Sequence, residues 1–320
     1  MKHTMLLTAI FLFVQFLYSA CSQYPESEKE IFMFSYFTGN GESGLHLAYS
    51  EDGYHFTAIN NGQSLLTPTA GGDKLMRDPC IIRGGDGLFH MVWTVSWNEK
   101  GIGYATSPDL IHWSDQRYLP VMEHEKDTRN TWAPEVFYDE DEQIYLIFWS
   151  STIEGLYPET QSNLENAYNH RKYYTTTKDF RTFSETRLFY EPGFNVIDGT
   201  IIKSDDEYVM FIKDETIEPA EKNIRITRSH NLTGEFGPAS EPITGDYWAE
   251  GPSVTKVSDQ WIVYFDKYVE GTMGAVASPD LESWTDISDK ISFPEGTRHG
   301  TVFTITENEF EYLMSALIPE

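Results

Sequence analysis

Three acidic residues lie in similar short contexts along the chain, and their side chains could carry out acid–base chemistry. They are found in the steps Arg77-Asp78-Pro79, Ile197-Asp198-Gly199 and Glu250-Gly251-Pro252. Two carboxyl groups that face each other across a pocket can cleave a glycosidic bond: one stays ionised and activates water, and the other donates a proton to the leaving oxygen. A third carboxylate beside the acid raises the pKa of that acid by like-charge repulsion.

The spacing of these residues suggests that the fold brings them together. Each lies eight or nine residues before a turn, and Ala133 and His299 occupy the corresponding places in two further segments. If the five segments are equivalent strands around one axis, the five positions converge at one end of it. An Asp before Pro or Gly is often only a turn residue, and this stays the alternative for each acid alone. Three carboxylates at one equivalent position are costly unless they are used.

A repeated turn motif indicates which elements position the acids. A Ser or Thr is followed two residues later by Asp or Asn and then by an aromatic residue, at intervals of roughly 55 residues. The copies begin at Ser50, Ser107, Thr177, Ser229 and Ser278. Ser and Asp side chains bond nearby backbone N–H groups, and the aromatic residue begins the next strand. The motif therefore marks the same strand-to-turn junction five times.

Paired apolar segments and the near absence of helical periodicity predict an all-β, five-bladed β-propeller of four-stranded blades. The last apolar pair consists of 301–303 and 310–314, both expected as strands. Its partner strands are expected over 31–37 and 45–56, so that joining N- and C-terminal strands closes the ring. A β-sandwich or a two-domain all-β protein is the alternative.

The first residues read as a targeting segment. Residues 5–17 are almost wholly apolar, which is too short for a membrane span but suits a signal peptide. Small residues before Cys21 resemble a bacterial lipoprotein signal, which implies lipidation of Cys21 and a periplasmic, outer-membrane or cell-surface location in a Gram-negative bacterium. The predicted organisation is a signal peptide over 1–20, a tether over 21–30 and one catalytic propeller over 31–320. Ordinary cleavage that leaves a free cysteine is the alternative.

Composition limits the classes of partner. With 23 Lys and Arg against 50 Asp and Glu, the net charge is −27, which disfavours nucleic acid because the phosphate backbone would be repelled. Aromatic residues make up 15% of the chain and suit stacking on sugars. Membrane contact is expected only through the lipid anchor, and the protein is expected to be a monomer. No disulfide is expected between Cys21 and Cys80.

Together, the motifs resemble glycoside hydrolase family 43, five-bladed propeller enzymes that cleave with inversion. The resemblance covers Ile31 to Glu320 and implies that Asp78 is the general base, Glu250 the general acid and Asp198 the residue that tunes the pKa of the acid. It also covers Trp132-Ala133-Pro134 in the intervening segment. Members often hold an ion or a water cluster near an axial histidine, so no cofactor is required but a structural calcium ion near His299 is an option.

The resemblance implies an exo-acting enzyme that releases a terminal sugar, with α-L-arabinofuranose expected and β-xylosides, β-galactosides and galactofuranosides as alternatives. A non-catalytic glycan-binding surface lipoprotein and a phosphorolytic enzyme are the alternatives from other classes. The expected substrate-binding residues, which neighbour the central positions, are Arg77, Trp132, Trp248, Arg298 and Glu135. The polar insertion over 151–172 is either a solvated loop or a wall of the substrate cleft.

Overall fold

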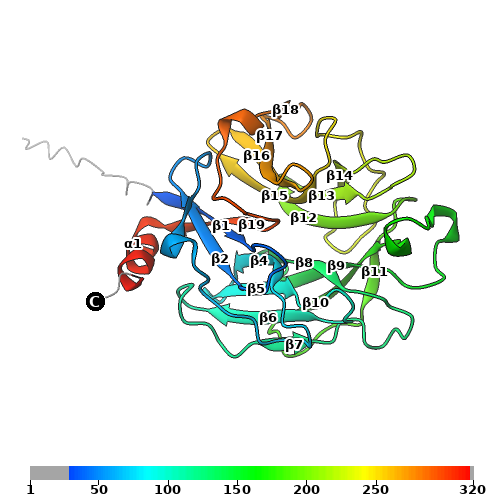
Figure 1. The fold of residues 1–320 in the computed structure, drawn as a ribbon, viewed down its shortest axis with the longest axis horizontal. Helices are drawn as coiled ribbons and strands as arrows, with labels where there is room; N and C mark the ends of the chain where they lie inside the picture. The colour runs from blue at the N-terminus through cyan, green and yellow to red at the C-terminus, as the bar shows by residue number, and fades with distance from the viewer. Residues whose placement is uncertain (1–28, 318–320) are drawn as a thin grey trace, which may run out of the picture.

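The computed structural model describes residues 29–317, which form five antiparallel sheets around a common centre (Figure 1). The predicted signal peptide, the predicted lipidation site Cys21 and nearly all of the predicted tether lie outside the described residues. The described part of the chain is mostly strand and holds one α-helix and four short 3-10 turns. The predicted five-bladed β-propeller is therefore confirmed.

Each blade is one sheet. The first blade contains β19 (Thr301–Thr306), β1 (Glu30–Tyr36), β2 (His46–Ser50) and β3 (Thr57–Ala58). The second contains β4 (Arg77–Arg83), β5 (Phe89–Thr94), β6 (Ile102–Ser107) and β7 (Arg117–Leu119), and the third β8 (Trp132–Asp139), β9 (Ile144–Ser151), β10 (Arg171–Thr177) and β11 (Arg187–Tyr190). The fourth contains β12 (Val196–Ser204), β13 (Glu207–Asp214) and β14 (Asn223–Ser229), and the fifth β15 (Glu250–Val257), β16 (Gln260–Lys267), β17 (Thr272–Ser278) and β18 (Thr285–Asp286).

The fourth blade departs from the four-strand pattern in its outermost position. Residues 237–243 run beside β14 and form three backbone hydrogen bonds with it, from Gly237, Ser240 and Ile243. Two prolines, Pro238 and Pro242, interrupt this segment, and proline has no N–H to donate to a ladder. The segment therefore occupies the place of a fourth strand without forming a regular one.

The ring is closed as predicted, by strands from the two ends of the sequence. Strand β19 pairs antiparallel with β1 over six residues, from Glu30 opposite Thr306 to Ser35 opposite Thr301. Strand β1 then pairs with β2. The innermost strand of this blade thus comes late in the chain, and its outer strands come first.

The strand expected over residues 310–314 is wrong, because this segment lies within helix α1 (Glu307–Ala316). The edge of β19 is already occupied by β1, so no strand position is left beside it. A capping box starts the helix: Thr306 accepts from the backbone of Glu309, and the Glu309 side chain accepts from the backbone of Thr306.

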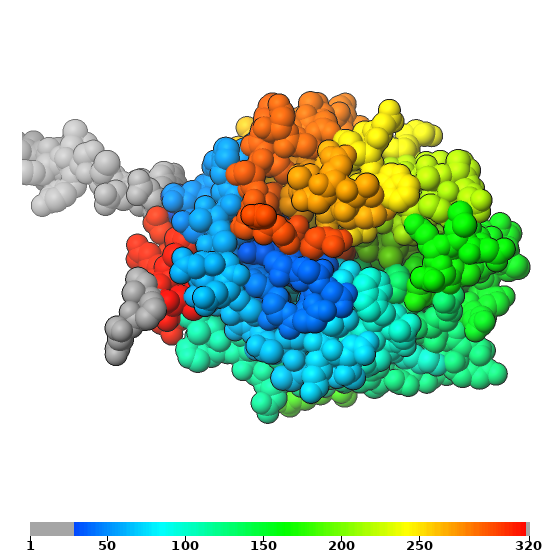
Figure 2. All heavy atoms as spheres, in the orientation of Figure 1, coloured from blue at the N-terminus to red at the C-terminus, as the bar shows by residue number. Residues whose placement is uncertain are grey.

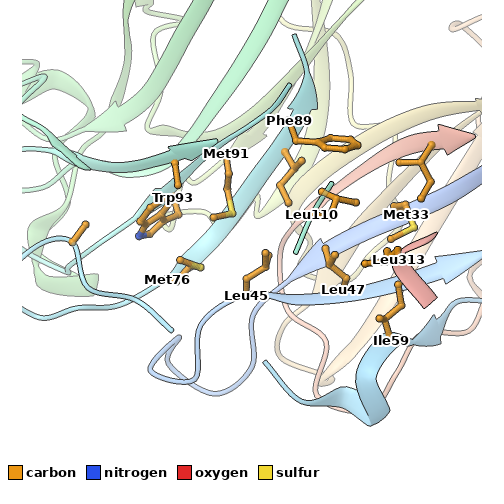
Figure 3. Close-up of a cluster of buried hydrophobic side chains, with 14 of the residues drawn as sticks. Met33, Leu45, Leu47, Ile59, Met76, Phe89, Met91, Trp93, Leu110 and Leu313 are labelled. Carbon is orange, nitrogen blue, oxygen red and sulfur yellow. The ribbon is translucent and has the colours of Figure 1, made fainter. Parts of the chain in front are cut away.

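The apolar residues of α1 recur three and four positions apart, which is a helical rather than a strand period. Leu313 is buried near Met33 and Leu47 of the first blade (Figure 3), in a cluster that also contains Phe89 and Met91 of the second blade. Helix α1 therefore covers the outer end of the junction at which the ring closes.

The repeated turn motif has the predicted structure. In its first copy, the Ser50 hydroxyl accepts from the backbone of Gly53 at 2.9 Å, and Asp52 accepts from the backbone of Tyr54 at 2.7 Å. These local bonds fix the junction between the third and fourth strands of the blade, so the motif shows from the sequence alone where each blade reaches its outer strand.

No helix within residues 29–317 has the length and apolar character that a membrane crossing requires.

Candidate active site

The innermost strands of four blades begin with an irregularity that turns one residue toward the axis. At this point the second, third, fourth and fifth blades each show a register shift against the neighbouring strand. The residues with left-handed backbone there are Asp78, Ala133, Asp198 and Gly251, with φ of 51°, 45°, 52° and 60°. Asp78, Ala133 and Asp198 therefore occupy equivalent positions, as predicted.

Glu250 does not share that position, which corrects the predicted alignment. Its structural equivalents are Arg77, Trp132 and Ile197, one residue earlier in each blade. Gly251 takes the left-handed position instead, where a Cβ would lie 2.3 Å from the His299 ring. One position along a strand reverses the direction of a side chain, so Glu250 enters the site from a different side.

All three predicted acids nevertheless line one cavity of about 260 Å³ near the centre of the propeller. Its lining consists of Arg77, Asp78, Thr94, Trp97, Trp132, Ala133, Ile197, Asp198, Lys213, Glu215, Glu250, Tyr268, Arg298 and His299. Figure 2 shows one face of the molecule with a hollow near its middle, between blue and orange-red segments. The cavity is smaller than the roughly 300–1,000 Å³ typical of drug-sized ligands, so it suits one small unit.

Asp78 is held by one hydroxyl and one imidazole. Its Oδ2 accepts a hydrogen bond from Thr94 at 2.8 Å, and its Oδ1 lies 3.4 Å from Nδ1 of His299. Since the side chain also lines the cavity, Asp78 is placed to accept a proton from a water there.

Asp198 is buried and connects the inner strands of two blades. Its Oδ2 accepts from the backbone N–H of Gly251 at 2.8 Å, and its backbone carbonyl accepts from Lys172 at 2.8 Å. It also lies 3.8 Å from Nδ1 of His299. Asp198 therefore fixes the backbone that carries Glu250. Burial alone would lower the pKa of His299, but the charges of Asp198 and Asp78 outweigh it and raise that pKa.

Glu250 lies between two cations, each shared with a second carboxylate. Lys213 donates to its Oε2 at 3.1 Å and Arg298 to its Oε1 at 3.2 Å. Lys213 is also 2.7 Å from Glu215, and Arg298 donates to Asp266 at 2.6 Å. Each cation is thus shared between Glu250 and a second carboxylate, which is Glu215 for Lys213 and Asp266 for Arg298.

The charged network continues from Lys213 through Glu215, which also lines the cavity, to Lys222 and Glu165 outside it. Burial alone would lower the pKa of Lys213, but Glu215 and Glu250 outweigh it and raise that pKa well above its usual value. Glu215 is bonded in turn by the fully buried Lys222 at 2.8 Å, and Lys222 reaches Glu165 at 2.6 Å. Alternating charges thus connect Glu250 to the insertion between β9 and β10.

Glu135 is buried and does not line this cavity. It is buried on the inner strand of the third blade, where it accepts from Cys80 at 3.4 Å and from Thr301 at 3.2 Å. Burial raises its pKa to about 7. The structure therefore does not bring Glu135 to the substrate-binding position expected for it.

Glu135→Gln is expected to change the pH dependence of stability. Because the pKa is raised in the fold, the wild type loses stability as pH rises from about 4.5 to about 7, by on the order of 3 kcal/mol. The glutamine variant lacks this loss, so its stability relative to wild type should increase over that window and stay level above it. Denaturant unfolding at pH 5 and pH 8 measures the difference. An equal difference at both values contradicts the expectation.

The tryptophans predicted to bind sugar have different positions. Trp132 lines the cavity, donates its indole N–H to the carbonyl of Trp97 at 3.0 Å and packs edge-on against that ring. Trp248 does not line the cavity; it packs against Tyr268 at a ring distance of 6.0 Å. Tyr268 itself lines the cavity, so Trp248 supports the wall from behind.

Besides Thr94 and Ile197, sequence reasoning missed four lining residues with charged or aromatic side chains: Trp97, Lys213, Glu215 and Tyr268. All four lie near the ends of second strands or just after them, rather than on the inner strands. The sequence did contain a signal for these positions. The second strand of each blade is as recognisable in the sequence as the inner strand. Because the two strands pair antiparallel, the end of the second strand must lie beside the start of the inner strand.

The donors around His299 do not fit a calcium ion bound directly by protein. Its Nδ1 faces Asp78 and Asp198, at 3.4 and 3.8 Å. Within residues 29–317, no group of three or more His, Cys, Asp or Glu side chains is arranged to hold a metal ion. Calcium prefers six to eight oxygen ligands. The calcium site near His299 stays a prediction, and nothing in the chemistry below depends on it.

Comparison with known proteins agrees with this geometry. A family model described as "Probable glycosyl hydrolase domain", related to glycoside hydrolase family 43, matches residues 28–311. An α-L-arabinofuranosidase of Bifidobacterium longum subsp. longum is 26% identical over 259 residues, which cover 68% of this chain and 24% of that protein. The chain thus spans about a quarter of the length of the curated relative that it matches.

Two solved structures share the fold. A thermostable family-43 glycoside hydrolase has a TM-score of 0.52 at 14% identity and covers 71% of this chain and 81% of its own. An α-L-arabinofuranosidase from Lactobacillus brevis has a TM-score of 0.53 at 18% identity and covers 67% and 72%. At these identities the likeness is one of fold, and it confirms the five-bladed propeller.

Proposed function

Since the chain belongs to the family of probable glycosyl hydrolase domains related to glycoside hydrolase family 43, we propose that it is an inverting, exo-acting glycosidase that releases terminal α-L-arabinofuranose. The observation that carries this proposal is the convergence of Asp78, Asp198 and Glu250 on one cavity of about 260 Å³. The name of the Bifidobacterium relative supports the choice of sugar. β-Xylosides, β-galactosides and galactofuranosides remain the alternative substrates.

In the proposed reaction, a water in the cavity attacks the anomeric carbon while Asp78 takes its proton. Glu250 gives its proton to the leaving oxygen. The Asp78 and Glu250 carboxyl groups should lie roughly 6.5–9.5 Å apart, which leaves room for that water. Asp198 keeps Glu250 in place through the Gly251 N–H, and its negative charge favours the protonated form of the acid.

The cations around Glu250 have two tasks in this scheme. They orient the carboxyl before proton transfer, and they stabilise the carboxylate that remains after it. Lys213 and Arg298 bond different oxygens of Glu250, so the group is held in one plane. Preorganised charges of this kind need no rearrangement during the reaction.

The stereochemistry of the first product tests the proposal. With 4-nitrophenyl α-L-arabinofuranoside as substrate, proton NMR during the first minutes should show β-L-arabinofuranose ahead of the α anomer. The 4-nitrophenyl β-xyloside and β-galactoside should be cleaved more slowly. Early release of the α anomer contradicts inversion, and faster cleavage of another glycoside corrects the sugar. Asp78→Asn protein purified in parallel controls for contaminating enzymes.

A further inference from the structure

One fully buried lysine near the candidate site has no carboxylate within ion-pair distance in the part of the chain that the structure describes. Lys172 lies on β10 of the third blade, and its ammonium group contacts a backbone carbonyl and a hydroxyl. Lys213 and Lys222 are buried too, but each is paired with two carboxylates. Taking an ammonium group out of water is costly, so Lys172 calls for a role other than ion pairing.

Building on the proposed function, we propose that Lys172 is a positioning residue for the reaction. By holding the backbone of Asp198, it places the Asp198 carboxylate, which in turn holds the segment that carries Glu250. Lys172 does not line the catalytic cavity, so it acts through Asp198 and not on the substrate.

The ammonium group of Lys172 reaches from the third blade to the fourth. Its Nζ donates to the backbone carbonyl of Asp198 at 2.8 Å and to the Ser150 hydroxyl at 3.1 Å. The register of β12 against β13 passes from Ile197 to Gly199 and leaves Asp198 without an opposite residue. Lys172 therefore supplies a donor, from the neighbouring blade, to the one residue that the ladder skips at this point.

The backbone at Asp198 needs such support. Its φ of 52° lies in the left-handed region, which is unfavourable for a residue with a side chain and persists only where the surroundings hold it. The next residue is Gly199, where a Cβ would lie 2.9 Å from the Phe211 carbonyl oxygen and 3.4 Å from Nζ of Lys172. Lys172 therefore packs directly against the bare backbone of the bulge.

The side chain of Asp198 extends this placement to the general acid. Its Oδ2 accepts from the Gly251 N–H at 2.8 Å, and Gly251 directly follows Glu250. If the Asp198 backbone moves, its carboxylate moves away from Gly251 and the segment that carries Glu250 loosens. A displacement of about 1 Å at a catalytic group can cost on the order of 10²-fold in rate, so a small shift at the bulge is enough to matter.

The charge of Lys172 is held at a cost in stability. Burial lowers the pKa of Lys172 from 10.5 to about 8, although the charges of Asp198 and Glu135 oppose this shift. The folded protein thus releases the proton more readily than the unfolded chain, so wild type gains stability as pH rises from about 8 to about 10.5. The charged form near pH 7 is therefore unfavourable for the fold, which favours a role in the site over a role in stability.

The test is Lys172→Met, which keeps the length of the side chain but removes its donors and its charge. On methyl α-L-arabinofuranoside, kcat should fall about tenfold with KM little changed, because the residues that line the cavity stay in place. The loss should be several-fold smaller on the 2,4-dinitrophenyl glycoside, whose leaving group departs without protonation. General loosening of the fold would lower both rates alike, so equal losses overturn the inference, as does normal turnover of both substrates.

Two further variants support the comparison. Lys178→Met changes an exposed lysine in the turn after β10 and should alter neither rate. Ser150→Ala removes the second acceptor of Lys172 with little change in volume, so it decides the inference if Lys172→Met does not fold. A loss of about threefold on the methyl glycoside, with a smaller loss on the dinitrophenyl glycoside, then supports the inference, and unchanged rates overturn it.

Hydrogen exchange separates this inference from the proposed function. If wild type cleaves neither arabinofuranoside, the proposed sugar fails, and the exchange rate of the Gly251 amide decides the inference. That amide donates to Asp198, so NMR of ¹⁵N-labelled protein should show it exchanging about tenfold faster in Lys172→Met than in Lys178→Met, because local opening exposes the amide. Equal exchange of the Gly251 amide in the two variants overturns the inference.

Discussion

Replacing Glu250 by Gln should reduce kcat/KM on natural linkages by about 10²–10⁴-fold, which is the usual contribution of a general acid. Glutamine keeps the size of the side chain and can still accept from Lys213 or Arg298, but it cannot donate a proton that then leaves. The loss should shrink on 2,4-dinitrophenyl glycosides, because a dinitrophenolate departs without protonation. The measurement is kcat/KM on both substrate types.

A matched control is available on the surface of the same blade. Glu270 lies exposed beyond the end of β16 and pairs only with Lys267 among the ion pairs described, so Glu270→Gln should leave both rates unchanged. Near-normal turnover of Glu250→Gln on natural linkages would show that another group donates the proton. Glu135, which the sequence predicted to bind substrate, is buried and does not line the cavity, so Glu215 is the residue to test next.

Asp78→Asn should lose activity to a similar extent but without dependence on the leaving group. An amide oxygen can still accept from Thr94, so the local structure should persist, but it cannot take the proton of the attacking water. Water activation is needed whichever group departs, so dinitrophenyl and natural substrates should both fall by on the order of 10²–10⁴. Comparing the ratio of the two kcat/KM values with that of Glu250→Gln separates base from acid.

Asp289 provides the control for this substitution. It is exposed, in a 3-10 turn at the edge of the fifth blade, so Asp289→Asn should not affect either rate. Thermal unfolding of Asp78→Asn should stay close to wild type. If dinitrophenyl substrates restored the activity of Asp78→Asn as they do for Glu250→Gln, Asp78 would not be the base and the two assignments would have to be exchanged.

The propeller could be predicted because a short local motif marks the same strand-to-turn junction in each blade. Each Ser–Asp turn forms its own hydrogen bonds within four residues, as at Ser50 and Asp52, so the repeat survives large changes elsewhere. The segment 310–314 was mispredicted for the opposite reason. An apolar run of five residues fits a strand or a buried helix, and the choice here depends on β1 already occupying β19 and on the Thr306 capping box.

The candidate site was predicted in its acids but not in its surroundings. Asp78 and Asp198 share a backbone irregularity that the Pro and Gly after them mark in the sequence. The offset of Glu250 by one residue was missed although the sequence marks it. Aligning Pro252 with Pro79 and Pro134 puts Gly251, and not Glu250, at the position of Asp78 and Ala133. The contact of Lys213 with Glu250 was missed because it joins β13 to β15 of the next blade, and no local pattern predicts a contact between blades.

Strand β19, which closes the ring, directly follows two residues that the active site needs. Arg298 and His299, which contact Glu250, Asp266, Asp78 and Asp198, immediately precede β19. Pairing of β1 with β19 joins residues at opposite ends of the sequence, and contacts of such long range form slowly because their loop must close first. Until that step, the site lacks its imidazole and one of its two cations. Ring closure therefore also completes the active site, so a chain stalled before this step holds the acids without the groups that organise them.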